Sequence, residues 1–286
     1  FFLTATDGSY VETTAPTSYA QVASGSWSMY GVVYNAADGD LELSGFLNPS
    51  TNFDISTAVY SQSFSIGSQE TNPAQIAFNT DGTKMFVVGF TGDDVNEYIL
   101  STAFDISTAS FVDSFSVAAQ ETQPTSLAFN TDGTKMFVAG FTGDDVNEYT
   151  LSTGFDVSTA SFVDSFYIGG QETVPIGIAF NTDGTKLFVC GNTGKDINEY
   201  TLSTGFDVST ASFVDSVSVV GQDSYPTGVA FNTDGTRMFV VGDSNASVYQ
   251  YTLSTGFDVS TASYSKTFSV TTQTVAPQGI AFNNDG

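Results

Sequence analysis

One phrase recurs at a fixed interval along this chain of 286 residues. The phrase "FNTDGTKMFV" and its close copies begin at positions 51 residues apart: Phe78, Phe129, Phe180, Phe231 and, cut short as "FNNDG", Phe282. A second phrase, "FDISTA" or "FDVSTA", keeps the same interval from Phe53 to Phe257. Tandem repeats of roughly 20 to 50 residues are typical of solenoids and propellers. The sequence therefore predicts an array of similar units.

Within one repeat, apolar and polar residues alternate, and turn residues divide the chain into four short segments. Such alternation predicts β-strands, and the Asp81-Gly82 pair predicts a hairpin turn because it tolerates positive φ. In the repeat that begins near residue 72, we expect strands at residues 74–78, 85–88, 95–100 and 110–117. Polarity rises from the first strand to the last, as in a blade whose first strand lies near an axis and whose last strand meets solvent.

Four antiparallel strands per repeat predict an all-β fold, a β-propeller of four-stranded antiparallel blades. A parallel β-helix would need shorter units, and leucine-rich or ankyrin repeats would show helical periodicity. The segment "PTSYAQVASGSWSMYGVV" echoes the repeat and predicts a degenerate first blade. The predicted organisation is a linker or attachment arm at 1–15, the degenerate blade at 16–71, and repeats at 72–122, 123–173, 174–224 and 225–275.

Residues 276–286 are predicted to be the closing strand of the ring. An unpaired strand edge invites aggregation, and propellers avoid it by closure. We expect the segment from residue 279 to 283 to pair with residues 28–36, in the same chain or in a neighbouring subunit. The other strands of this N-terminal blade are expected near residues 41–46 and 59–66. Closure in this way gives five blades; six or seven blades remain the alternative if a longer natural chain is cut here.

The repeat "GIAFNTDGTKLFVCGNTGKDINEYTL" resembles the repeats of YVTN-type, lactonase-like β-propellers. The segment "LSTGFDVSTASFVDS" is similar to long arrays in proteins of marine bacteria and their phages. The resemblance covers about residues 50 to 286 and implies the propeller fold, which hosts many unrelated activities. Lactonase-like enzymes hold a divalent cation or use His and Arg in the central channel. Here the strand expected at the channel is small and apolar ("GIAF", "SLAF", "GVAF").

The composition excludes several kinds of chemistry. The chain contains no histidine, which excludes an imidazole base, histidine metal ligands and a Ser-His-Asp triad. Its single cysteine, Cys190, stands where other repeats have Val or Ala, so we expect a buried side chain rather than a nucleophile. With 31 acidic and 6 basic residues, the net charge of -25 argues against nucleic acid as a partner. No apolar run approaches the roughly 18 residues of a membrane span, so no membrane insertion is expected.

Two groups of acidic loops are expected on one face, because connections in an antiparallel blade alternate between the two faces. The loops between the second and third strands carry Asp93, Asp94, Asp144, Asp145, Asp196 and Asp243. The loops that join successive blades carry Glu70, Glu121, Glu172 and Asp223. From the two groups we select these candidate binding residues: Asp93, Asp94, Asp144, Asp145, Asp196, Asp243, Glu121 and Glu172. Carboxylate oxygens suit hard cations, so calcium at Asp93, Asp94, Asp144 and Asp145 is one hypothesis. The alternative is a solvated acidic rim, since the chain has no complete calcium loop.

Three functional classes follow from these features. The first is a non-enzymatic structural or adhesive module of a virion appendage or cell surface, extracellular or in a virion. Its partners would be other structural proteins or host-surface glycans, and a homo-oligomer is one possible form. The second is a lectin-like binder that uses tyrosines in the third strands for sugar stacking: Tyr98, Tyr149, Tyr200 and Tyr251. The third is a lactonase-type hydrolase.

Overall fold

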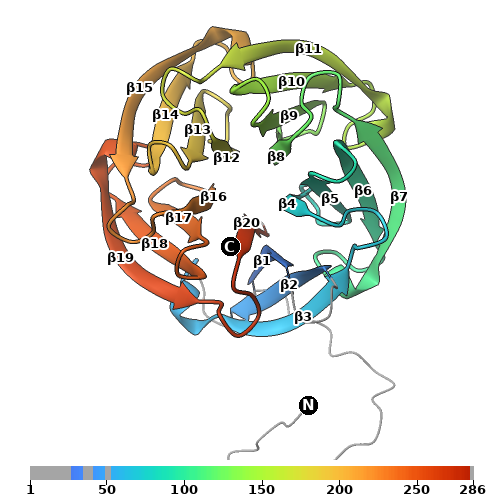
Figure 1. Cartoon of the computed structure of the whole chain (residues 1–286), viewed down its shortest axis with the longest axis horizontal. Helices are drawn as coiled ribbons and strands as arrows, with labels where there is room; N and C mark the ends of the chain where they lie inside the picture. Colours follow the sequence, from blue (N-terminus) through green and yellow to red (C-terminus); the bar gives the residue numbers. More distant parts are fainter. Residues whose placement is uncertain (1–26, 35–40, 49–52, 284–286) are drawn as a thin grey trace, which may run out of the picture.

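The computed structural model describes residues 27–34, 41–48 and 53–283 of the chain. These residues form five four-stranded antiparallel sheets, arranged as blades around a central axis (Figure 1). The prediction of an all-β propeller of four-stranded antiparallel blades is therefore confirmed. The proposed arm at residues 1–15 lies outside the described residues.

Four of the sheets are each made from strands that follow one another in the chain. In the first of them the order from the axis outward is β4 (Pro73–Phe78), β5 (Lys84–Gly89), β6 (Asp94–Leu100) and β7 (Ala109–Ser116). The next three sheets repeat it: β8 (Pro124–Phe129), β9 (Lys135–Gly140), β10 (Asp145–Leu151), β11 (Ala160–Tyr167); β12 (Pro175–Phe180), β13 (Lys186–Gly191), β14 (Asp196–Leu202), β15 (Ala211–Ser218); β16 (Pro226–Phe231), β17 (Arg237–Gly242), β18 (Ser247–Leu253), β19 (Ala262–Ser269).

The remaining sheet is composite, because it joins strands from both parts of the chain. It contains β1 (Trp27–Tyr34), β2 (Leu41–Asn48), β3 (Val59–Ser65) and, on the inside, β20 (Pro277–Phe282). β20 runs antiparallel to β1, with Phe282 opposite Met29 and Ala281 opposite Tyr30. The predicted closing strand is confirmed, and it pairs within the same chain.

A short 3-10 helix precedes the outer strand of every blade: η1 (Ile55–Thr57), η2 (Ile106–Thr108), η3 (Val157–Thr159), η4 (Val208–Thr210) and η5 (Val259–Thr261). In each case an aspartate caps the helix by accepting a bond from the serine amide two residues later, as Asp156 does from Ser158 at 3.2 Å. The "FD[IV]STA" phrase therefore encodes a helix cap. Among the described residues, no helix is long and apolar enough to cross a membrane.

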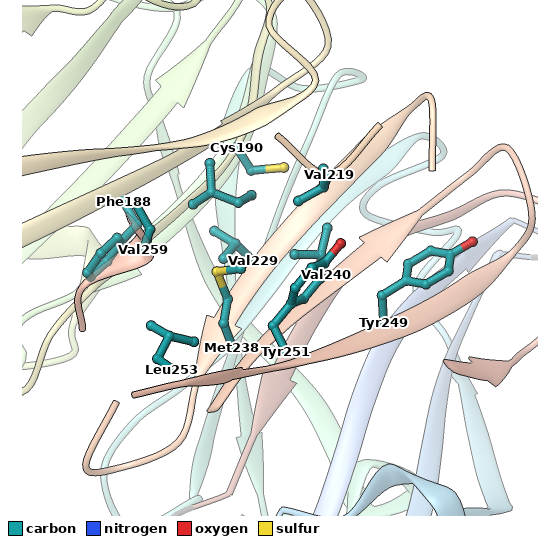
Figure 2. Packing of buried hydrophobic residues seen from close by; sticks show 11 residues of the cluster. Phe188, Cys190, Val219, Val229, Met238, Val240, Tyr249, Tyr251, Leu253 and Val259 are labelled. Atoms are coloured by element: carbon teal, nitrogen blue, oxygen red, sulfur yellow. The ribbon is translucent and has the colours of Figure 1, made fainter. Parts of the chain in front are cut away.

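The hydrophobic core lies between neighbouring blades rather than inside one blade. In Figure 2, Phe188 and Cys190 of β13 pack against Val229, Met238 and Val240 of the next blade. Cys190 is fully buried, as predicted, and burial raises the pKa of its thiol well above the ordinary value. The phenylalanines that open the repeated phrase end the innermost strands, where they are half-buried.

The hairpin turn predicted at Asp81-Gly82 is confirmed, and an unusual phenylalanine supports it. Gly82 has a φ of 70°, and the ring of Phe104 lies against its Cα, where a Cβ would otherwise be. Phe104 itself has a φ of 56°, a left-handed conformation that is strained for a bulky residue. The packing of its ring against Phe78, with centroids 5.5 Å apart, helps to hold that conformation.

The side chains of the outer strands do not simply alternate between inward and outward positions. Glu97 pairs with Asp113 but the next residue, Tyr98, pairs with Phe111, so Val112 forms a β-bulge. Phe111 and Val112 are consequently both exposed, by 42% and 52%. The expected alternation of inward and outward side chains is wrong at this point, and the same bulge recurs in β11, β15 and β19.

Candidate functional site

The two groups of acidic loops meet on one face of the ring, as the sequence predicts. In the blade of β4, the amide of Phe90 donates to the carbonyl of Asn72 at 3.0 Å. The hydroxyls of Thr71 and Thr91 are 2.7 Å apart and share a hydrogen bond. The loop that enters the blade and the loop between β5 and β6 are therefore held together as one unit.

A buried carboxylate lies at the centre of each such unit. Glu121 is completely buried, and its carboxylate accepts bonds from the amides of Gln123 (2.7 Å) and Thr142 (3.1 Å). Glu70, Glu172 and Asp223 repeat this arrangement. The prediction that these residues belong to a solvated rim is wrong for the four carboxylates, because each one replaces solvent as the acceptor for loop amides. Glu121 and Glu172 cannot touch a partner while the loops keep this conformation.

The second carboxylate of each unit is half-buried beside the first. Burial raises the pKa of Asp94, and the neighbouring charge of Glu70 raises it further, although the amide of Asn96 donates to it at 2.7 Å. The same causes raise the pKa of the equivalent residues Asp145 and Asp196. In the blade of β16 the equivalent position is Ser247, and Asp243, from the position of Phe90, has its pKa raised by burial and by the charge of Asp223. Each of the four blades from β4 to β19 thus contains a pair of acidic groups that repel each other.

Asp93 and Asp144 have a different role from their neighbours in sequence. Both adopt left-handed φ values, 48° and 50°, and the carbonyl of Asp93 accepts a bond from the amide of Val117 at 2.8 Å. Aspartate tolerates this conformation better than most residues. Lys195 and Ala246 occupy the same turn position in the next two blades, so the turn does not need a carboxylate.

Within the described residues, this arrangement does not bring together enough carboxylates to coordinate a calcium ion. In the part of the chain that the structure describes, no group of three or more acidic, cysteine or histidine side chains could hold a metal ion. The structure brings Asp94 together with Glu70 and Asp145 together with Glu121, which gives pairs rather than cages. Calcium at Asp93, Asp94, Asp144 and Asp145 stays a prediction.

Around the axis, the innermost strands of neighbouring blades approach one another closely at several positions. A Cβ on Gly177 would come within 2.9 Å of the Cα of Gly228, and the hydroxyl of Thr125 donates to the carbonyl of Pro175 at 2.9 Å. The side chain of Gln75 lies against Gly279. The innermost strands, as described, carry no ionisable side chain. On the side of the Asp-Gly turns lies a shallow depression of about 410 Å³, lined mainly by phenylalanines, threonines and asparagines.

The tyrosines considered for sugar stacking are buried inside the blades. Tyr98, Tyr149 and Tyr200 are at most 1% exposed, and Tyr251 is 3% exposed. Tyr149 packs edge-on against Phe115 and Phe162 with centroids 5.7 and 5.8 Å apart. The hypothesis that these four rings stack on sugars is therefore wrong, because their faces are covered by neighbouring strands.

An ionic clasp between blades was missed by sequence reasoning. The ammonium group of Lys84 contacts the Glu97 carboxylate at 2.6 Å and the carbonyl of Phe155, in the next blade, also at 2.6 Å. The other oxygen of Glu97 accepts a bond from the amide of Val157 at 3.0 Å. Lys135–Glu148 and Lys186–Glu199 form the same clasp. The recurrence of a lysine and a buried-strand glutamate in three successive repeats was the available signal.

Solved structures resemble the chain at low sequence identity. A putative 6-phosphogluconolactonase from Bacteroides fragilis has a TM-score of 0.48 at 14% identity, over 88% of this chain and 69% of that one. The periplasmic gluconolactonase of Pseudomonas aeruginosa has a TM-score of 0.48 at 15% identity, over 90% and 70%. A chain of a nidogen/laminin complex has a TM-score of 0.54 at 11% identity, over 90% and 98%.

Lactonase-like propellers are therefore among the structural neighbours, and the likeness concerns the fold alone. No protein-family model matches the sequence, and no curated protein is similar to it.

Proposed function

We propose that this propeller is a non-enzymatic structural or adhesive module that contacts its partners through the outer strands. The observation that carries the proposal is a repeated exposed apolar surface. We define the girdle as the Phe-Val pairs on three successive outer strands: Phe111 and Val112, Phe162 and Val163, Phe213 and Val214. Each of these side chains is between 42% and 52% exposed. Contiguous exposed apolar groups rimmed by polar residues mark surfaces that bind other proteins, and each Phe-Val pair is flanked by an exposed serine and an exposed aspartate.

The placement of the acidic groups supports this choice of surface. The buried carboxylates of the loops hold the fold together and are not presented to a partner. By contrast, β7, β11 and β15 are the last strands of their sheets, so one edge of each lacks a strand neighbour within its sheet. We propose an extracellular or virion setting, of the kind implied by the resemblance to phage and marine-bacterial arrays, with structural proteins or surface glycans as partners.

A surface-binding assay tests the proposal. Fluorescently labelled wild-type chain and the triple variant Val112→Ser, Val163→Ser, Val214→Ser would be titrated against a panel of bacterial envelope preparations. We expect at least tenfold weaker binding for the triple variant. The matched control is Val275→Ser, because Val275 is a loop residue that is 69% exposed and lies outside the girdle. Equal binding by all three chains, or turnover of gluconolactone above background, would contradict the proposal.

A further inference from the structure

One blade junction contains an ion pair that the corresponding junctions lack. The ammonium group of Lys266, on β19, donates to the carboxylate of Asp54 at 2.8 Å. Asp54 caps η1 of the adjacent composite blade, where it also accepts the amide of Ser56. The bond from Lys266, together with those from Ser56, lowers the pKa of Asp54 to about 2. Both partners are about one-third exposed, so the pair lies at the outer surface.

Three other junctions have a carboxylate in the place of this ammonium group. Lys266 is opposite Gln250 in its sheet, and the residues at the same register position in the other blades are Asp113, Asp164 and Asp215. These strands contact the helices of the following blades as β19 contacts η1. The caps of those helices are aspartates with the same serine bonds as Asp54: Asp156, Asp207 and Asp258.

Beside the lysine–glutamate clasp described above, each of these junctions therefore carries two aspartates, and the outer-strand aspartate lies opposite the glutamate of the clasp. The junction of Lys266 carries a lysine and an aspartate at the two equivalent positions. The Asp113 carboxylate accepts the amide of Ser114 at 2.8 Å, and Asp156 accepts that of Ser158 at 3.2 Å. A cation that reached both aspartates would be attracted by their charges. The Lys266–Asp54 contact indicates which kind of cation the helix cap accepts, namely a primary ammonium group. Asp113, Asp164 and Asp215 are all exposed, so such a group can arrive from outside.

The surroundings of these aspartates indicate what should carry the ammonium group. On β7, Phe111 and Val112 lie directly before Asp113 and form part of the girdle. The free edge of β7 offers backbone amides and carbonyls along the same line. An extended segment with a lysine and with apolar residues two positions before and after it would match all three features, because strand addition supplies backbone bonds while side chains supply specificity. The net charge of -25 would attract such a basic segment from a distance.

We infer that the girdle contains three equivalent docking sites for lysine-bearing, extended segments of a partner protein, centred on Asp113, Asp164 and Asp215. The inference rests on the proposed function and adds the chemistry of the partner to it. The lysine of each segment would lie between the aspartate of the outer strand and the helix cap of the following blade.

The first test asks whether the junction accepts an ammonium group at all. Asp113→Lys should reproduce the Lys266–Asp54 pair against Asp156 and raise the melting temperature by about 1 to 3 °C over Asp113→Asn. The gain should disappear in the double variant Asp113→Lys, Asp156→Asn. A melting temperature for Asp113→Lys that is equal to or below that of Asp113→Asn would overturn the inference.

The second test uses a blocked peptide with the sequence of residues 262–269, ASYSKTFS, and a version with Gln in place of Lys. We expect the lysine peptide to bind the wild-type chain at least fivefold more tightly than the glutamine peptide, and to lose this advantage on the Asp113→Asn, Asp164→Asn, Asp215→Asn variant. Equal affinity of both peptides would overturn the lysine sites and leave the girdle as a contact surface. Binding of neither peptide would overturn docking by strand addition. The role of the girdle as a contact surface is tested separately by the envelope-binding assay.

Discussion

At the scale of single residues, the repeat depends on side chains that do two things at once. Gly133 supplies a φ of 71° to the hairpin turn, and the absence of its Cβ leaves room for the ring of Phe155. Asp132 accepts the amide and the hydroxyl of Thr134 at 3.0 and 2.6 Å, which fixes the same turn. The turn geometry therefore constrains the aspartate, the glycine and the last threonine of the phrase "NTDGT" at the same time.

Replacement of Gly133 by alanine should reduce the free energy of unfolding by about 2 to 4 kcal/mol, because the new methyl group meets the Phe155 ring and the φ value disfavours it. Chemical denaturation would measure the loss. Gly170→Ala is the matched control, since a Cβ there has nothing within 4 Å, and it should change stability by less than about 0.5 kcal/mol. Similar losses in the two variants would argue against the ring-on-glycine contact.

Asp145 and Asp132 should respond to pH with opposite signs. Burial raises the pKa of Asp145 above its unfolded value, so its neutral form favours folding, and that favourable contribution is lost as the pH rises through the folded pKa. Bonds from Thr134 lower the pKa of Asp132, so its contribution is present above the unfolded pKa and is lost as the pH falls.

Asp145→Asn should therefore stabilise the chain at pH 7 and have little effect near pH 3, whereas Asp132→Asn should destabilise it at pH 7. Denaturation curves for both variants at the two pH values would check the signs. Stabilisation by Asp145→Asn that is equally large near pH 3 would show that charge is not its cause.

At the scale of elements, most strands could be predicted from the sequence, whereas the contacts between blades could not. Alternation and the Asp-Gly pairs located β4 to β7, because these patterns act within one hairpin. The bulge at Val112 was missed, since "FVDSFS" contains no glycine or proline to mark an irregularity, and the extra residue emerges only from pairing with β6. The burial of Glu121 was also missed, because a loop carboxylate is usually exposed; its constant position three residues before the proline of the next strand was the available signal.

The clasp between blades leads to a prediction at this scale. Lys135→Met should cost about 2 to 3 kcal/mol of stability, because it removes the partner of the buried Glu148 carboxylate and the bond to the Phe206 carbonyl. In the double variant Lys135→Met, Glu148→Gln, the loss should be smaller than the sum of the two single losses. Additive losses, measured by chemical denaturation, would show that the two residues act independently.

At the scale of the whole molecule, the ring is closed by β20 and carries a large negative charge. Its net charge of -25 should destabilise the compact state through self-repulsion, which dissolved salt screens. β20 closes the ring, because it supplies the innermost strand of the composite blade from the other part of the chain.

The melting temperature should therefore rise between about 0.01 and 0.5 M sodium chloride, as the screening length falls from roughly 30 Å to a few ångströms. Calcium chloride at matched ionic strength should give the same rise if the carboxylate pairs act only through their charge. A distinctly larger rise in calcium, abolished by Asp94→Asn and Asp145→Asn, would instead support the calcium hypothesis.

The composite blade also determines how the ring responds to mechanical load. β1 begins, and β20 ends, at the same end of their antiparallel pair, since Met29 is opposite Phe282. A pull that separates residues 27 and 283 therefore loads the backbone hydrogen bonds one after another, as in a zip, rather than all together in shear. Tension applied between these two residues, as in single-molecule force spectroscopy, should therefore open the composite blade at low force and leave the other four sheets folded.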